Sequence, residues 1–136
     1  MGWLTLPDAE GSGWSGLWSA LFTAERAVCA LVRVTSLAEA LDLIWLADEL
    51  ADDRRDLTRT HAAEIAGAVA VDFGPLPADH EPVAAHGTVA RLVSRVIARA
   101  DELAAAGQSP HDALWLAGVG ASLFAARARL AGTGTR

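Results

Sequence analysis

The chain has 136 residues, 52% of them hydrophobic, and its length suits one domain with a single core. The net charge of −6 excludes a general nucleic-acid surface, because phosphate contacts need a basic face. The single cysteine, Cys29, excludes an internal disulfide and a cysteine-based metal site. The start of the chain lacks a signal-peptide pattern, and the long apolar run Ala113–Ala126 is too short to span a bilayer about 30 Å thick. We therefore expect a cytoplasmic protein that contacts neither membrane nor nucleic acid.

Residues 1–14 form a lead-in that contains glycine and proline, and the first expected helix covers residues 15–33. Ser36, followed three positions later by Glu39, is typical of a capping box at the start of a helix. Apolar residues then recur with helical spacing, and almost no helix-breaking residue interrupts them. The pattern predicts one long second helix over residues 36–72.

A loop rich in glycine and proline at residues 73–77 separates this segment from a third expected helix over 81–106, which Gly107 ends. A fourth helix over 109–131 has proline in its first turn, where that residue is favourable, and residues 132–136 form a tail. No segment alternates polar and apolar residues with period two, so we expect no sheet.

These segments predict an all-α protein, an antiparallel four-helix bundle over residues 15–131 with short connections. It becomes a five-helix bundle if the second helix breaks in its charged run, residues 52–56. Several inward positions are expected to lie in the core: Ala51, Ile65, Val93 and Leu123.

The length of the second helix indicates a homodimer. At about 1.5 Å per residue it would reach roughly 55 Å, well beyond the first and fourth helices. Leu43–Ala47 is also apolar on every side, which a single neighbouring helix cannot cover. We expect the dimer to use the second helix, the fourth or both.

Three polar residues interrupt the apolar face of the second helix at successive turns: Arg54, Thr58 and His61. Buried polar groups need partners, since an unpaired one costs several kcal/mol. One interpretation is a ligand pocket, in which Arg54 holds an anionic oxygen and His61 moves a proton. The alternative is a structural network, with Arg54 paired to a nearby aspartate, Thr58 bonded to the Arg54 carbonyl and His61 satisfied in the core.

Two further titratable residues complete the candidate catalytic set. His86 lies on the inner face of the third helix, where it could share a pocket with His61. Glu25 lies among apolar residues of the first helix, where a carboxyl group can serve as a general acid. We expect no metal and no other cofactor. Metal or haem binding by His61 and His86 is a minor alternative, since the remaining ligands of a di-metal bundle are missing.

Four apolar or small residues are candidates for the walls of such a pocket. Trp45 and Trp115 would suit a hydrophobic ligand, although core or dimer-interface roles are also open. Gly118 and Gly120 each cost about 1 kcal/mol against alanine inside a helix, so a close backbone or space for a ligand must favour them.

The pattern leaves two functions open. The first is binding of a hydrophobic small molecule, with cofactor-independent acid/base chemistry such as cyclisation, isomerisation or dehydration. The second is a non-enzymatic interaction protein whose apolar helix faces bind a partner chain. Inward Arg and His residues favour the first function. A cavity with Arg54 and a histidine in its wall would support it, whereas a solid core with paired polar groups would support the second.

Overall fold

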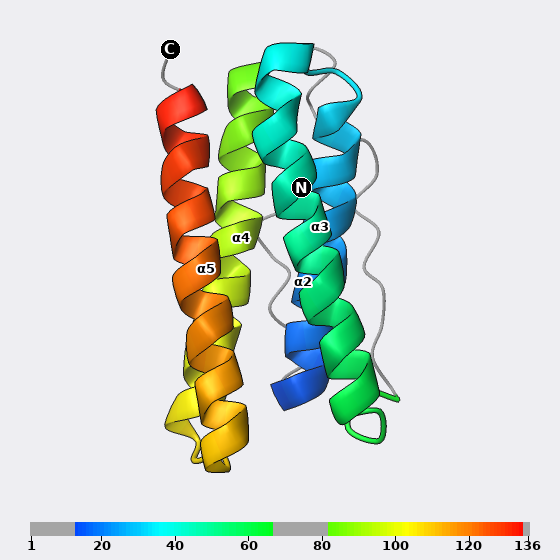
Figure 1. Ribbon diagram of the computed structural model, residues 1–136, viewed down its shortest axis with the longest axis vertical. Helices are drawn as coiled ribbons and strands as arrows, with labels where there is room; N and C mark the ends of the chain where they lie inside the picture. The colour runs from blue at the N-terminus through cyan, green and yellow to red at the C-terminus, as the bar shows by residue number, and fades with distance from the viewer. Residues whose placement is uncertain (1–12, 67–81, 135–136) are drawn as a thin grey trace.

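The computed structural model describes the backbone of residues 13–66 and 82–134 and the side chains of residues 13–66 and 85–130. Four helices make up most of these ranges: α2 (Gly13–Val32), α3 (Leu37–Thr60), α4 (Pro82–Ala105) and α5 (Pro110–Gly134) (Figure 1). No strand occurs in the described ranges, which confirms the all-α prediction. None of these helices is long and apolar enough to cross a membrane.

The packing of the helices is compatible with a four-helix bundle. α2 packs against both α3 and α4, whereas α5 packs closely against α4 and only lightly against α3. The chain runs up in α2, down in α3 and α4, and up in α5, so neighbours around the bundle are antiparallel (Figure 1). α3 and α4 therefore point the same way, and residues 61–81 separate them. The expectation of short connections is wrong here.

One hydrophobic core joins the four helices. Its largest fully buried side chains come from every helix: Leu17, Leu21, Leu31, Leu43, Leu50, Leu57, Leu116, Leu123, Val28, Val89, Val93 and Val96. The predicted core positions are buried, since Ala51, Ile65, Val93 and Leu123 are at most 8% exposed. Apolar spacing therefore predicted the inward positions Ala51, Val93 and Leu123 of the helices correctly. Ile65 is buried as well, but it lies in the turn after α3 and not in a helix.

The second helix is shorter than the sequence pattern predicts, because α3 ends at Thr60. Its C-cap residue, His61, leaves the helical conformation with φ −130° and ψ 39°. Thr60 donates its hydroxyl to the Asp56 carbonyl, a local bond that competes with helix continuation. The described turn extends to residue 66, and residues 67–72 of the predicted helix lie outside the described residues.

The shorter α3 removes one reason for expecting a dimer. The helices have 20, 24, 24 and 25 residues, so α3 is no longer than α4 or α5. α3 is continuous through the charged run at residues 52–56, so the five-helix alternative receives no support there. At the ends of the chain, α2 begins at Gly13 within the predicted lead-in, and α5 continues to Gly134 in the predicted tail.

Local signals placed the other helix ends well. α3 begins directly after Ser36, although the Ser36 side chain makes no capping hydrogen bond. α5 begins after Ser109, whose hydroxyl accepts a hydrogen bond from the Asp112 N–H at 3.2 Å. After the end of α4, Gly107 adopts φ +85°, a conformation that glycine reaches without strain.

Candidate functional site

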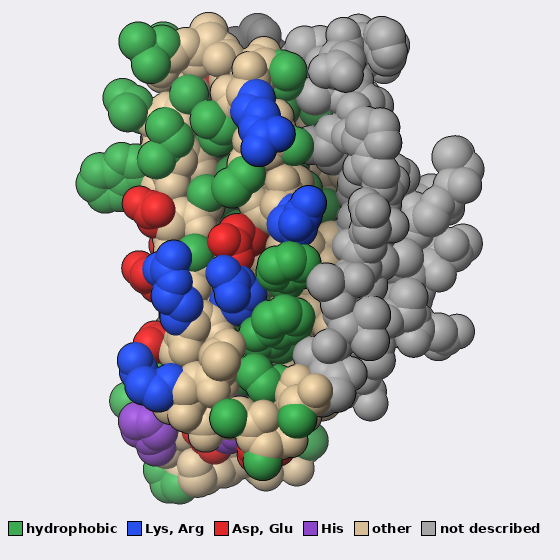
Figure 2. All heavy atoms as spheres, turned by 90° about the vertical axis from the view of Figure 1, so that its right-hand side faces the viewer, with side chains coloured by type: hydrophobic (Ala, Val, Ile, Leu, Met, Phe, Trp, Pro, Cys, Tyr) green, Lys and Arg blue, Asp and Glu red, His purple; other side chains and the backbone are tan. Residues whose placement is uncertain are grey.

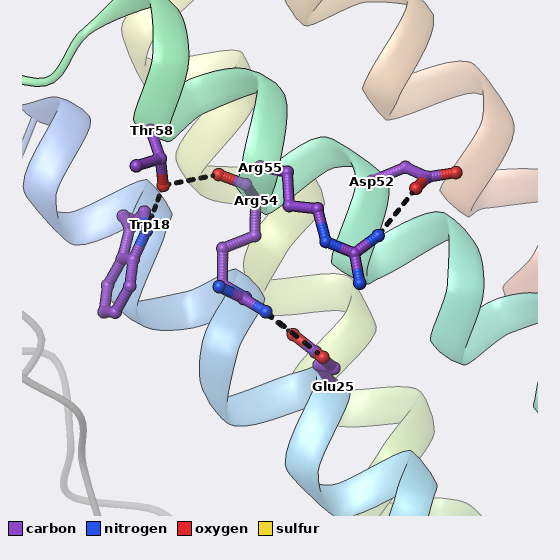
Figure 3. A network of polar contacts seen from close by, with 6 residues as sticks. All are labelled: Trp18, Glu25, Asp52, Arg54, Arg55 and Thr58. Atoms are coloured by element: carbon purple, nitrogen blue, oxygen red, sulfur yellow. Dashed lines mark hydrogen bonds and ion pairs between the residues drawn. The ribbon is translucent and has the colours of Figure 1, made fainter.

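Arg54 and Glu25 form an ion pair between α3 and α2 (Figure 3). Arg54 Nε donates to Glu25 Oε1 at 2.7 Å, and Nη2 lies 3.4 Å from Oε2. The two side chains are only 22% and 19% exposed, and the guanidinium lies 5.6 Å from the centre of the Phe22 ring. Both carboxylate oxygens of Glu25 thus engage Arg54, and the sequence had identified these two residues separately.

Thr58 links the same two helices one turn further along α3. Its hydroxyl donates to the Arg54 carbonyl at 2.9 Å, the bond expected in a structural network, and accepts from Trp18 Nε1 at 3.0 Å (Figure 3). The Trp18 ring stacks on Phe22, with centroids 5.3 Å apart. Thr58 and Arg54 are therefore satisfied by α2 and α3 themselves, with Glu25 in place of the expected aspartate.

His61 joins three parts of the chain at the end of the bundle where α3 finishes. Its ring stacks on Trp14 of α2 at 3.8 Å, Nδ1 lies 2.9 Å from Glu64, and Nε2 lies 3.1 Å from Asp112 of α5. Carboxylates only accept hydrogen bonds, and a neutral imidazole has only one N–H to donate, so both contacts together require protonated His61. Burial lowers the pKa of His61, but the bonds to Glu64 and Asp112 outweigh it and raise the pKa overall.

His86 lies at the opposite end of the bundle from His61. It contributes to a hollow beside Ala126 and Leu130, near the end of α5, whereas His61 contacts Asp112 near its start. At about 1.5 Å per residue, these places are more than 20 Å apart. The predicted pocket shared by Arg54, His61 and His86 is therefore wrong, and one metal ion or haem cannot bind both histidines.

The hollow at His86 is shallow, with a cavity volume of about 10 Å³, roughly the space of one water molecule. It lies between α3, α4 and α5 and is lined by Glu39, Asp42, Leu43, Leu46, His86, Ala126, Arg129 and Leu130. None of the predicted wall residues lines it. In the described part of the chain, no group of three His, Cys, Asp or Glu residues could hold a metal ion.

The predicted wall residues are spread over the bundle. Trp45 is 73% exposed in the first half of α3, whereas Trp115 packs on the core 6.4 Å from Trp14, at the His61 end. A Cβ added at Gly118 would meet nothing within 4 Å, and one at Gly120 would only touch the Asp101 carboxylate at 4.0 Å. No backbone packs closely on either glycine.

Asp53 is a perturbed group that the sequence analysis missed. Its Oδ2 atom is buried and has no hydrogen-bond partner among the described residues. Burial, followed by the negative charges of Glu49, Asp56 and Asp52, raises the pKa of Asp53 to about 7. Its position three residues after the buried Leu50 and four before the buried Leu57 was the available signal, which the surrounding charged run obscured.

α3 and α5 also carry an exposed apolar surface. On α3 it includes Leu37, Leu41, Ile44 and Trp45; on α5 it includes Leu114, Ala117, Gly118, Ala121, Phe124, Ala125 and Ala128. We call these residues the outer apolar surface. Figure 2 faces α2 and the adjoining side of α3, and it shows hydrophobic side chains gathered toward the end of the bundle where α3 begins, with arginine and acidic side chains below them; α5 lies on the far side of this view.

Known proteins give no independent indication of function, since no family model, curated protein or solved structure matches the chain significantly.

Proposed function

We propose that this protein is a non-enzymatic helical interaction protein that binds another polypeptide chain through the outer apolar surface. The observation that carries the proposal is the exposure of large hydrophobic side chains along α3 and α5. Leu37 is 83% exposed, Trp45 73% and Leu114 75%. Apolar side chains clustered at exposed positions are typical of protein interaction sites.

The paired polar residues support this proposal over catalysis. Arg54, Thr58 and His61 each have partners within the bundle, and those partners satisfy the groups that a substrate would otherwise contact. The surrounding core is filled by large aliphatic side chains. With its acidic charge and single cysteine, the chain is suited to the cytoplasm, which we propose as its location.

A second candidate function rests on the hollow beside His86. Three leucines and Ala126 line its apolar part, while Glu39, Asp42 and Arg129 supply charges around His86, which is 8% exposed. The enclosed part of the hollow has space for about one water molecule, so a small ligand would have to bind in its open part, beside His86 as an acid or base. Native mass spectrometry of protein from its own host tests this candidate, which predicts a small bound molecule that His86→Leu removes.

In-cell photo-crosslinking tests the interaction proposal. A photoreactive phenylalanine analogue replaces Leu41 or Phe124 in the protein's own host, with a matched control at Glu102, whose side chain is 66% exposed on α4. We expect a discrete polypeptide adduct from positions 41 and 124 and none from position 102. Equal labelling at all three positions, or no adduct at any, would refute the proposal.

A further inference from the structure

We propose that the partner of the outer apolar surface is a second copy of this chain. In this arrangement α5 packs antiparallel against α5 of the second copy, about a two-fold axis at Ala121. The inference rests on the proposed function, because it names the occupant of the same surface. Three features of α5 support it: its charge, the order of large and small residues, and the position of Gly118.

The exposed strip of α5 contains no charged residue along most of its length, and the charge that lies over it is the Arg127 guanidinium, 4.8 Å from the centre of the Phe124 ring. No acidic or basic residue occurs between Asp112 and Arg127, and the hydroxyl of Ser122, at the edge of the strip, already donates to Glu49 of α3. Two molecules of net charge −6 repel one another at a distance. Contact centred on the part of the strip between Asp112 and Arg127 avoids placing like charges opposite one another.

Large and small residues alternate along the strip in a self-complementary order. When α5 meets its own copy antiparallel about Ala121, residues whose numbers sum to about 242 lie opposite one another. Leu114, which is 75% exposed, then faces Ala128, and Phe124, which is 57% exposed, faces Ala117. Each large side chain meets a small one, as close packing between helices requires.

Gly118 is explained by close approach of this second helix. Glycine costs about 1 kcal/mol against alanine inside a helix. Within the chain, an added Cβ at Gly118 would meet nothing within 4 Å, so packing in one molecule does not require glycine. In the antiparallel pair Gly118 faces Ala125, where two small residues allow the helix backbones to approach closely.

The same axis also sets which residue of the second copy lies level with the exposed aromatic residue of α3. The Ser122–Glu49 hydrogen bond places residue 49 of α3 and residue 122 of α5 at the same height along the bundle. Because the two helices are antiparallel, the axis at Ala121 lies at the height of residue 50 of α3. In the proposed dimer Trp45 then lies level with Arg55 of the second copy, the residue that pairs with Asp52 in its own chain.

Disulfide trapping tests both the partner and the register. In a Cys29→Ser background, Ala121→Cys brings two thiols together at the axis, whereas Ala128→Cys or Leu114→Cys alone leaves them about 21 Å apart along the helices. Disulfides need Cα atoms within about 7 Å. We expect mild oxidation to link Ala121→Cys into dimers, to leave each control single variant unlinked, and to link Leu114→Cys with Ala128→Cys when the two proteins are mixed. The mixed pair tests the register without altering Ala121.

The outcomes separate this inference from the proposed function. Failure of both Ala121→Cys and the mixed pair to link, with a mass of 14.2 kDa for the wild type in sedimentation equilibrium, overturns the second copy as partner. If position 124 still gives in-cell adducts to a different polypeptide, the proposed function stands. Equal linking of Ala128→Cys and Ala121→Cys would overturn the two-fold axis at Ala121.

Discussion

The two helices α2 and α5 are both strongly apolar, yet only α2 is buried on most of its circumference. Ten residues of α2 are buried, and they include small polar residues such as Ser19 and Thr23. α5 buries only one stripe, which includes Leu116 and Leu123, and leaves Leu114 and Phe124 exposed. The difference shows that an apolar helix predicts a surface that other residues should cover. Only the fold shows whether residues of the same chain cover it.

α3 lies between these two helices and is held differently on each side. Toward α2 it offers Arg54, which pairs with Glu25. Toward α5 it offers the acidic Glu49, which bonds Ser122, with Asp53 one turn further along. α3 is therefore tied to α2 by an ion pair and to α5 by a hydroxyl–carboxylate hydrogen bond.

The sharpest test of the contrast within α5 compares its buried and exposed leucines. Leu123 is fully buried and Leu114 is 75% exposed. We expect Leu123→Ala to lower the free energy of unfolding by about 2–5 kcal/mol, and Leu114→Ala to change it by less than about 0.5 kcal/mol. Urea unfolding of dilute protein measures both. Similar losses for the two variants would mean that the outer strip of α5 is covered within the monomer.

The next test concerns the attachment of α3 to α2. Arg54→Met leaves the mostly covered Glu25 without its ion pair, so we expect a loss of about 1–3 kcal/mol in the free energy of unfolding. Adding Glu25→Leu should restore much of it, because an apolar pair can replace a covered ion pair. A double-mutant cycle measures the coupling; additive losses would show that the pair contributes nothing to stability.

Asp53 should make stability fall as pH rises. Its pKa in the fold is about 7 against an ordinary 3.8, so the unfolded chain loses its proton first. The loss of folding free energy caused by ionised Asp53 begins above about pH 4 and is complete above about pH 7. Asp53→Asn should therefore stabilise the protein at pH 8, by about 1–2 kcal/mol, and by much less at pH 4. Parallel pH profiles for wild type and variant would contradict this assignment.

Protonated His61 should stabilise the end of the bundle where α3 finishes. Its pKa is raised above 6.5, so its stabilisation is fully present below about pH 6.5 and is lost as pH rises through the raised pKa. We expect His61→Gln to cost about 1 kcal/mol at pH 5.5 and clearly less at pH 9. His111→Gln, an exposed change on α5, is the matched control. A cost independent of pH would assign His61 a packing role only.

The smallest expected effect is that of Gly118→Ala, which should stabilise the monomer and weaken the proposed dimer. Gly118→Ala should raise the monomer's free energy of unfolding by up to about 1 kcal/mol, because the new methyl group meets nothing within the chain. The same methyl group should weaken the proposed dimer, so that sedimentation equilibrium gives a lower association constant. The control is Ala117→Gly on the same strip, which should lower the monomer's free energy of unfolding because glycine is less favourable than alanine in a helix. Tighter association of Gly118→Ala would contradict a close helix contact.

Apolar periodicity predicted the helices and their inward faces because both depend on local spacing. It did not predict the end of α3, where His61 stacks on Trp14 and contacts Asp112, residues far away in the sequence. Glu25 and Arg54 were both identified, but nothing local indicates that residues 29 positions apart form a pair.

The error over the shared pocket arose from helix direction. Short connections would have made α3 and α4 antiparallel neighbours and placed the end of α3 beside the start of α4, bringing His61 near His86. The two helices instead lie diagonally and point the same way (Figure 1). The two histidines therefore lie at opposite ends of the bundle.

Hydroxyl-radical footprinting in intact host cells tests the central claim, that another chain covers the outer apolar surface, most directly. In dilute purified protein, Phe124 and Trp45 should be oxidised readily, whereas the buried Leu123 should be protected. In the cell we predict that Phe124 and Trp45 become protected to a similar degree as Leu123, while exposed residues outside the surface, such as Arg26, remain reactive. Unchanged oxidation of Phe124 and Trp45 in the cell would contradict the account.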